Sequence, residues 1–381
     1  MPRLPIYSLG LLVIVLPALA RAAEPVQAPV FVSGEGGYHT YRIPSVIVTT
    51  KGIVLAFCEG RKGGRGDAGD VDLLLRRSTD GGKTWGKAQV VWDDGENTCG
   101  NPCPVVDAKT GTVWLLMTHN LGTDTEAAIT SGKSKGTRTV WVTSSTDDGA
   151  TWTKPVEITK DVKKPGWTWY ATGPGVGIQL KRGRLLVPCD SKSDGMKVRE
   201  SHVIYSDDGG KSWKLGGVVG PNCNECQAVE LLDGSVMLNM RSFGGDNRRL
   251  VAVSKDGGET FSKPVEDEAL VEPVCQASIL RLPAFSRDSP GASGTGSSRE
   301  KVGVLFSNPA STKREKMTVR LSRDDGKTWP HAKELHAGPA AYSCLVVLPN
   351  GEIGCLYERG DKSPYETITF ARFPRGWLTG E

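Results

Sequence analysis

Short apolar segments alternate with polar, glycine-containing turns along most of the chain. One unit recurs six times: an apolar segment, a turn, and a second apolar segment. Short apolar runs bounded by turn residues are typical of β-strands, and no helical period of useful length appears. The second segments of the six units lie at residues 53–57, 113–117, 185–187, 236–238, 302–306 and 353–357.

Five of the six units continue into a third strand that ends in one octapeptide, S-x-D-x-G-x-[TS]-[WF]. Its copies lie at residues 78–85, 145–152, 206–213, 254–261 and 322–329. Aspartate accepts hydrogen bonds from nearby backbone N–H groups and glycine adopts positive φ, so each copy predicts a structural turn. The repeats predict an all-β fold, a six-bladed β-propeller, in which residues 29–32 supply the strand that closes the ring.

The direction of the strands predicts which residues share an edge of the propeller. In antiparallel strands, the start of the first strand and the end of the second lie on one edge, and the octapeptides lie on the other. Arginines, carboxylates and tyrosines gather on the shared edge. They include Arg42, Glu59, Arg61, Asp67, Asn101, His119, Tyr170, Asp190, Glu225, Arg241, Gln276, Arg314, Tyr342 and Glu358.

The N-terminal residues differ from the rest of the chain. Arg3 precedes an apolar run at residues 11–20, and small residues follow around position 22. This pattern predicts a signal peptide over residues 1–22, with a membrane anchor as the alternative. Residues 23–381 are then expected to form a single propeller domain that is secreted or periplasmic. We expect no membrane insertion of the mature chain, and a monomer.

Charge and cysteine content limit the classes of partner and cofactor. The formal net charge of +4 gives no reason to expect a nucleic-acid partner. The nine cysteines lack the spacing and the nearby histidines of a zinc site, so no metal is expected. Buried free thiols and a few disulfides both remain open.

Several motifs together resemble the exo-α-sialidases, over nearly all of the mature chain. The octapeptide matches the Asp box of sialidases and related propellers, and residues 41–44 (YRIP) match the opening motif of the family. Further similar segments lie at residues 59–61, 101–104, 224–227, 240–242, 306–309 and 341–343. The match is closest to secreted bacterial sialidases, glycoside hydrolases that remove terminal α-linked sialic acids.

The resemblance implies a role for each of these residues. Arg42, Arg241 and Arg314 would bind the sialic acid carboxylate, with Arg320 as the alternative third arginine. Planar guanidinium groups match a carboxylate better than lysine does. The other residues implied to bind substrate or to orient these arginines are Glu59, Arg61, Asn101, Tyr170, Asp190 and Glu358. At Asp190 the sequence departs from animal sialidases, which carry tyrosines there, so substrate preference stays open.

The resemblance also implies a catalytic group of three residues. Tyr342 would be the nucleophile, Glu225 its base, and Asp67 the general acid, with retention of configuration and no cofactor. A neutral phenol avoids the repulsion that a carboxylate nucleophile would meet at a carbon bearing a carboxylate. Trans-sialidases, including intramolecular ones, would share these residues. A glycan-binding propeller without catalysis would lack equivalents of Tyr342, Glu225 or Asp67.

Overall fold

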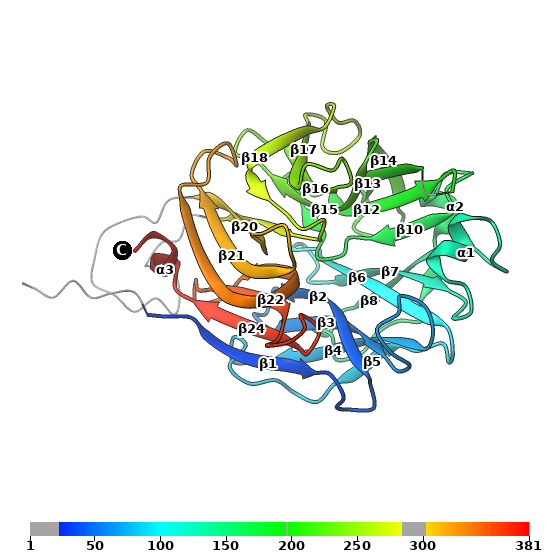
Figure 1. Ribbon diagram of the computed structural model, residues 1–381, viewed down its shortest axis with the longest axis horizontal. Coiled ribbons are helices and arrows are strands. Elements are labelled where there is room, and N and C mark those ends of the chain that lie inside the picture. Colours follow the sequence, from blue (N-terminus) through cyan, green and yellow to red (C-terminus); the bar gives the residue numbers. More distant parts are fainter. Residues whose placement is uncertain (1–22, 196, 284–301, 381) are drawn as a thin grey trace, which may run out of the picture.

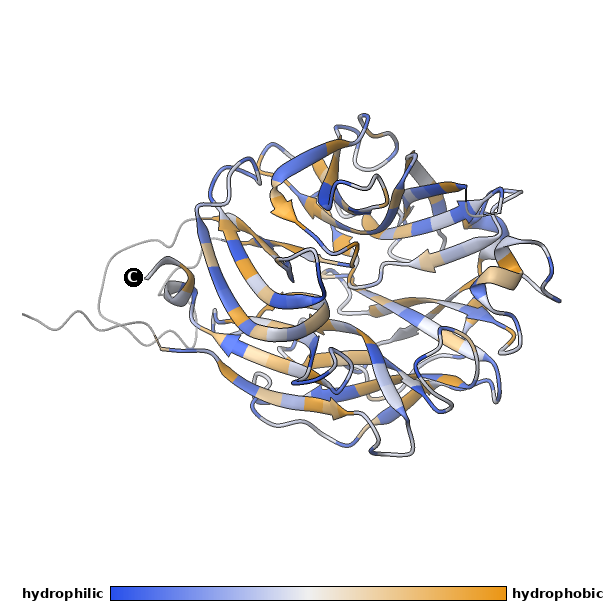
Figure 2. Ribbon diagram, viewed as in Figure 1, coloured by the Kyte–Doolittle hydropathy of each residue, from blue (hydrophilic) through white to orange (hydrophobic). Residues whose placement is uncertain are grey.

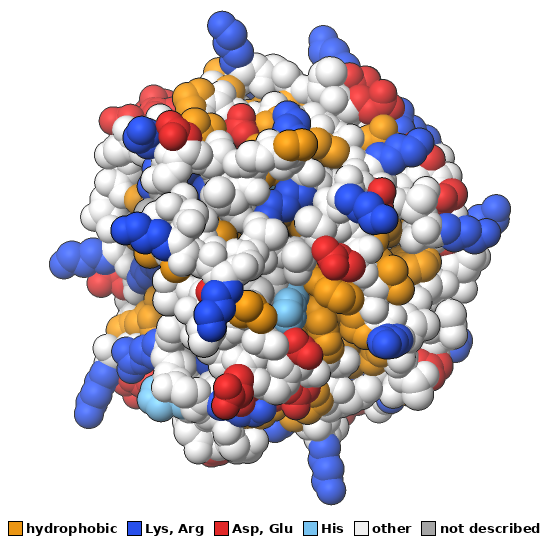
Figure 3. Space-filling model, turned by 90° about the vertical axis from the view of Figure 1, so that its right-hand side faces the viewer, with side chains coloured by type: hydrophobic (Ala, Val, Ile, Leu, Met, Phe, Trp, Pro, Cys, Tyr) orange, Lys and Arg blue, Asp and Glu red, His pale blue; other side chains and the backbone are white. Residues whose placement is uncertain are grey.

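A computed structural model describes residues 23–195, 197–283 and 302–380 of the protein. The predicted signal peptide, residues 1–22, lies outside the described residues. Strands radiate around a central axis in Figure 1, with apolar residues concentrated along them in Figure 2. On the face shown in Figure 3, basic and acidic side chains are interspersed.

The strands of the described residues form four hydrogen-bonded sheets, in which six antiparallel units can be distinguished. The first unit contains β2 (Thr40–Val48), β3 (Val54–Arg61), β4 (Val71–Ser78) and β5 (Gln89–Trp92). The second contains β6 (Thr98–Val106), β7 (Val113–Asn120), β8 (Thr139–Ser145) and β9 (Val156–Glu157). The third contains β10 (Trp169–Thr172), β11 (Ile178–Gln179), β12 (Leu185–Ser193), β13 (Val198–Ser206) and β14 (Lys214–Val219). A parallel pair between β4 and β6 joins the first two units. Of two short helices, α1 (Glu126–Thr130) precedes β8 and α2 (Thr159–Val162) follows β9.

The remaining three units complete the circle and confirm the predicted all-β propeller. They contain β15 (Cys223–Glu230), β16 (Val236–Ser242), β17 (Arg248–Ser254) and β18 (Val265–Val271); β19 (Ser278–Leu282), β20 (Gly303–Pro309), β21 (Glu315–Ser322) and the first part of β22 (His331–Val347); and the last part of β22 with β23 (Ile353–Arg359), β24 (Thr367–Phe373) and β1 (Val26–Val32). β22 is shared by the last two units. Helix α3 (Arg375–Thr379) follows β24.

The N-terminal strand closes the ring, as the sequence predicts. β1 pairs with β24, the last strand of the chain, so the sixth unit contains both ends of the described fold. The side chains of Val30 and Phe31 are almost fully buried in the core beside β24. Because the first and last strands share one sheet, the circle is held by backbone hydrogen bonds as well as by packing.

The Asp boxes are structural turns that join neighbouring units. In the first copy, the carboxylate of Asp80 accepts hydrogen bonds from the backbone N–H of Lys83 and Thr84 and from the Thr84 hydroxyl. Gly82 in the same turn has a φ of +81°, and a Cβ there would lie 2.2 Å from the ring of Phe370 in the sixth unit. The glycine therefore permits close approach of two units.

The register places the Asp boxes opposite the predicted site. In the first unit, Ser78 pairs with Val54 at one end of the β3–β4 ladder, and Arg61 pairs with Val71 at the other. Ser78 begins an Asp box, and Arg61 belongs to the predicted site.

All nine cysteines are buried free thiols. Within the described residues, no helix has the length and apolarity to cross a membrane.

Candidate active site

A cavity of about 550 Å³ opens on the edge opposite the Asp boxes. Every one of the twelve predicted site residues lines it except Tyr170 and Glu358. The six units all contribute lining side chains, so the site forms only when the ring is complete. The predicted residues at the cavity are Arg42, Glu59, Arg61, Asp67, Asn101, Asp190, Glu225, Arg241, Arg314 and Tyr342.

One irregularity recurs where four inner strands reach the cavity. In β2, β6, β15 and β22 the ladder skips, so that two consecutive residues face one residue of the neighbouring strand. Such β-bulges bend a strand and redirect its side chains. The doubled residues are 43–44, 101–102, 224–225 and 341–342. The bulges thus bring Asn101, Glu225 and Tyr342 to the cavity wall.

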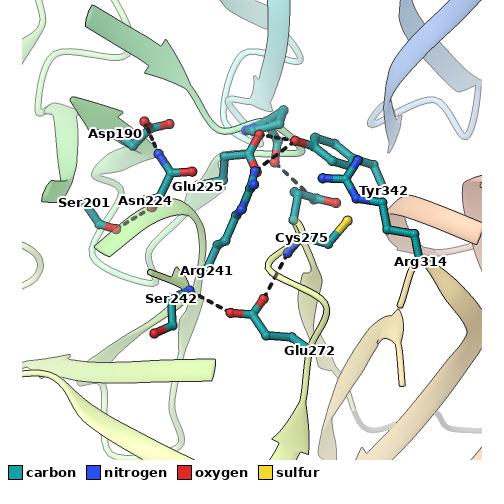
Figure 4. A network of polar contacts seen from close by, with 12 residues as sticks. Asp190, Ser201, Asn224, Glu225, Arg241, Ser242, Glu272, Cys275, Arg314 and Tyr342 are labelled. Atoms are coloured by element: carbon teal, nitrogen blue, oxygen red, sulfur yellow. Dashed lines mark hydrogen bonds and ion pairs between the residues drawn. The ribbon is translucent and has the colours of Figure 1, made fainter. Parts of the chain in front are cut away.

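Tyr342, Glu225 and Arg241 form a hydrogen-bonded triangle, shown in Figure 4. The Tyr342 hydroxyl donates to Glu225 Oε1 at 2.6 Å, and Arg241 Nη1 donates to Glu225 Oε2 at 2.6 Å and to the Tyr342 oxygen at 3.3 Å. Burial and the charge of Glu225 raise the pKa of Tyr342 well above its usual value, while Arg241 opposes this rise. The phenol is therefore neutral and already bonded to an acceptor for its proton.

Two further arginines face the same tyrosine. The guanidinium carbons of Arg42 and Arg314 lie 5.2 Å and 5.6 Å from the centre of the Tyr342 ring. Arg314 Nη1 also donates to the hydroxyl of Tyr365 at 2.7 Å. Arg320, the alternative third arginine, does not line the cavity and donates to Asn308 at 3.0 Å. The geometry therefore favours Arg314 over Arg320 for contact with an anionic ligand.

Glu358 lies behind the cavity wall and holds two of its parts. Its side chain is fully buried, and its Oε1 accepts hydrogen bonds from Arg42 Nε at 2.7 Å and from the backbone N–H of Ile43 at 2.9 Å. Its Oε2 accepts from the backbone N–H of Tyr342 at 3.1 Å. One carboxylate thus fixes both the arginine and the bulge that carries the tyrosine.

Asp67 lies on an exposed loop at the cavity mouth. Its side chain is 63% exposed, and its Oδ1 accepts from Arg61 Nη1 at 2.8 Å. Glu59 holds Arg61 from the other side, with its Oε2 at 2.6 Å from Nη2. Partial loss of solvent at the cavity mouth works against ionisation of Asp67, but the charges of Arg61 and Arg42 outweigh it and lower the pKa. Without a ligand, Asp67 is therefore a carboxylate.

Asp190 lies in another part of the cavity wall, and its pKa shifts in the direction opposite to that of Asp67. Its Oδ1 accepts from Asn224 Nδ2 at 2.7 Å, and its buried Oδ2 has no hydrogen-bond partner among the described residues. Burial, reinforced by the charge of Glu225, raises the pKa of Asp190 to about 8. Asp190 is therefore mostly protonated at pH 7.

Tyr170 does not reach the cavity, and its prediction as a substrate contact is corrected. β10 pairs with β12, so that Trp169 lies opposite Lys192 and Ala171 opposite Asp190. Residues opposite each other share a face of the sheet, and neighbours along a strand point to opposite faces. Trp169, Ala171 and the residues opposite them therefore face the cavity. Tyr170 points to the other face and is fully buried in the hydrophobic core.

Sequence reasoning missed several residues of the cavity wall. The guanidinium carbon of Arg138 lies 4.2 Å from the centre of the Trp169 ring, and its Nη2 donates to the side chain of Asn101. Strand alternation alone does not tell Trp169 from Tyr170, and no motif marks Arg138. The other unpredicted lining residues include Arg65, Glu126, Lys192, Arg199, Phe243 and Tyr365.

The chain is similar to known proteins over most of its length. Residues 52–355 match the family model for a BNR repeat-like domain. A sialidase of Micromonospora viridifaciens is 38% identical over 96% of this chain, which spans 57% of that relative's length. An exo-alpha-sialidase of Arthroderma benhamiae is 31% identical, and the match covers 95% of this chain and 89% of the relative.

A solved structure has a similar fold over most of this chain. The Hadza microbial sialidase Hz136 superposes with a TM-score of 0.80 and 30% sequence identity, over 92% of this chain and 69% of that one. The repeat match, the Arthroderma benhamiae relative and this superposition all cover most of the described propeller. The chain belongs to the sialidase family.

Proposed function

We propose that this protein is an exo-α-sialidase that hydrolyses terminal α-linked sialic acids of glycans with retention of configuration. The observation that carries the proposal is the Tyr342 hydroxyl, 2.6 Å from Glu225 Oε1 and surrounded by three arginines. A nucleophile paired with a base, beside a cluster that binds a carboxylate, suits the anomeric carbon of sialic acid. Residues 1–22 would be removed, and the enzyme would act outside the cytoplasm.

In the first step, Tyr342 forms a bond to the anomeric carbon. Its phenolic proton passes to Glu225 as the oxygen attacks, because a neutral phenol is a weak nucleophile near pH 7. The bond from the anomeric carbon to the glycan oxygen breaks, and protonated Asp67 gives its proton to that oxygen. The sugar is left bound to Tyr342, and Asp67 becomes a carboxylate.

In the second step, water releases the sugar. Asp67 takes a proton from the water, whose oxygen attacks the anomeric carbon. The bond to Tyr342 breaks, and the phenolate recovers its proton from Glu225. Two displacements at one carbon give overall retention, and neither step requires a cofactor.

The proposal requires the substrate to change the ionisation of Asp67. In the free protein, Arg61 and Arg42 lower its pKa. The carboxylate of a bound sialoside would neutralise much of the charge of Arg42, and the leaving glycan would displace water around Asp67. Both changes raise the pKa of a carboxyl group, so a bound sialoside would favour the protonated acid.

Covalent labelling tests the nucleophile directly. A fluorinated sialosyl fluoride forms the sugar–enzyme bond quickly and hydrolyses it slowly. We expect peptide mass analysis after trypsin to find the adduct on residues 334–359, which contain Tyr342. An adduct on residues 215–241, which contain Glu225, would contradict the mechanism, as would a Tyr342→Phe variant with the wild-type rate.

The product of a simple sialoside separates hydrolysis from transfer. Free sialic acid is expected from a hydrolase, whereas a trans-sialidase gives a transferred sugar or an intramolecular anhydro product. The presence of Tyr342, Glu225 and Asp67 at one cavity disfavours a glycan-binding propeller without catalysis.

A further inference from the structure

Three buried glutamates, one in the cavity wall and two behind it, each join an arginine to the backbone. Glu59 and Glu358 each bind one arginine and at least one backbone N–H group at a bulge. Glu272, directly after β18, is the third: it binds Arg249 and two backbone N–H groups. The first two hold Arg61 and Arg42 at the cavity, but neither Glu272 nor Arg249 lines it.

Glu272 is buried and makes two short contacts and one longer one. Its Oε1 accepts from the backbone N–H of Ser242 at 2.6 Å, and its Oε2 accepts from Arg249 Nη1 at 2.7 Å and from the N–H of Cys275 at 3.3 Å. The side chains of Arg249 and Glu272 are 0% and 1% exposed. Arg249 is held in turn by Asn239 Oδ1, at 2.7 Å from its Nε. This arrangement leaves Glu272 little freedom to move.

Ser242 directly follows Arg241 in β16. The hydrogen bond from the Ser242 N–H to Glu272 therefore acts on the backbone next to Arg241. The pairing of β16 with β17 ends at Met240 opposite Leu250, before it reaches Arg241. On the other side, Arg241 faces the bulge at residues 224–225. Glu272 therefore supplies an acceptor to the backbone where the ladder to β17 has ended, next to the arginine that binds Glu225 and Tyr342.

We propose that Glu272, held by Arg249, is a positioning residue that keeps Arg241 in place against Glu225 and Tyr342. Figure 4 shows the contacts of the Glu272 carboxylate with Ser242 and Cys275, and Arg241, the residue before Ser242, beside Glu225 and Tyr342. The inference rests on the proposed sialidase function, because its consequence is measured as turnover. Displacement of a reacting group by about 1 Å can lower a rate by about a hundredfold.

Glu272→Gln and Glu272→Ala test the proposal together. Glutamine keeps an acceptor for the Ser242 N–H but loses the charge that holds Arg249, and alanine loses both. With rates normalised to active sites counted by the fluorinated sialosyl fluoride, we expect kcat to fall about tenfold in Gln and further in Ala. KM should change less than kcat, because Arg42 and Arg314 still bind the carboxylate.

Asp325→Asn is the matched control. Asp325 also joins an arginine to a backbone N–H of the neighbouring unit: Oδ1 lies 2.8 Å from Arg281 Nη1, and Oδ2 lies 3.1 Å from the Leu232 N. It lies in an Asp box, on the edge opposite the cavity. Its variant should alter melting temperature but leave kcat per active site unchanged.

The outcomes separate the inference from the proposed function. Wild-type protein without hydrolysis of any sialoside would overturn the proposed function. Active wild-type protein with unchanged kcat per active site in Glu272→Gln would overturn the positioning role alone, whatever the loss of stability. If alanine at position 272 prevents folding, the glutamine variant and the control still decide the question.

Discussion

Asp190 and Asp67 are aspartates of one cavity, and their surroundings move their pKa values in opposite directions. Asp67 is exposed and ion-paired with Arg61, and the positive charges around it lower its pKa. Burial of Asp190, reinforced by the charge of Glu225, raises its pKa to about 8. A buried carboxyl without a cationic partner is more stable in its neutral form, and a protonated carboxyl can donate as well as accept a hydrogen bond.

The raised pKa of Asp190 predicts a specific pH dependence of stability. In the unfolded chain an aspartate ionises near pH ~4, so between about pH 4 and pH 8 the folded state binds more protons than the unfolded state. The free energy of unfolding therefore falls as pH rises through this window. Asp190→Asn removes the effect, and its stability relative to wild type should grow by about 1.4 kcal/mol per pH unit.

Urea unfolding at pH 5, 6, 7 and 8 measures this difference. The Asp67→Asn variant is the control, because the pKa of Asp67 is lowered and it is already ionised in both states over this range. A stability difference between Asp190→Asn and wild type that stays constant with pH would show that Asp190 is ionised in the folded protein.

At the scale of the strand and the turn, local departures from regularity build both edges of the propeller. On the site edge, four bulges redirect inner strands, and buried glutamates accept backbone N–H groups around them. On the other edge, the Asp-box glycines allow turns to lie against the preceding unit: a Cβ on Gly210 would lie 2.1 Å from the ring of Trp114. The first set serves the cavity and the second holds neighbouring units together.

Two adjacent glycines of the first Asp box test whether such glycines hold neighbouring units together. Both have positive φ, +73° at Gly81 and +81° at Gly82, so alanine strains the backbone at either position. Only at Gly82 would the new Cβ meet a neighbour, at 2.2 Å from Phe370, whereas nothing lies within 4 Å of a Cβ on Gly81. Overpacking should make Gly82→Ala less stable than Gly81→Ala by about 1–3 kcal/mol.

Thermal and urea unfolding of the two variants check this prediction, with kcat measured on the folded protein. Because Gly81 and Gly82 lie on the edge opposite the cavity, kcat should stay at the wild-type value in both. Equal losses of stability would indicate that the contact with Phe370 is relaxed without strain.

At the scale of the whole molecule, the cavity depends on ring closure. Tyr342 and Glu358 lie in the sixth unit, which is completed by β1 from the N-terminal end. Gln27 of β1 accepts from the Tyr357 hydroxyl and donates to the backbone carbonyl of Leu335 at 3.0 Å. Loss of β1 would expose the edge of β24 and the apolar core beneath it.

Deleting residues 23–32 together with 1–22 should therefore destabilise the protein and abolish activity. Burial of Val30 and Phe31 alone accounts for about 3–6 kcal/mol, at about 1.5–3 kcal/mol for each side chain. Deleting residues 1–22 alone is the control and should leave melting temperature and kcat unchanged. Full activity in the longer deletion would mean that β24 does not need its partner strand.

The sequence by itself determined the repeated unit, the Asp boxes, the closing strand and the edge on which site residues gather. These features follow from strand length, alternation and turn residues, which are local in the chain. The tyrosine–glutamate pairing could be expected only through family resemblance, since Tyr342 and Glu225 are 117 residues apart.

Only the tertiary structure decided which face of β10 meets the cavity. It also decided that Arg314, and not Arg320, faces Tyr342. A shift of one residue in register exchanges the two faces of a strand, so Tyr170 and Trp169 could not be told apart from the pattern alone. The pKa of Asp190 and the role proposed for Glu272 depend on burial and on neighbours distant in sequence. No local pattern encodes those contacts.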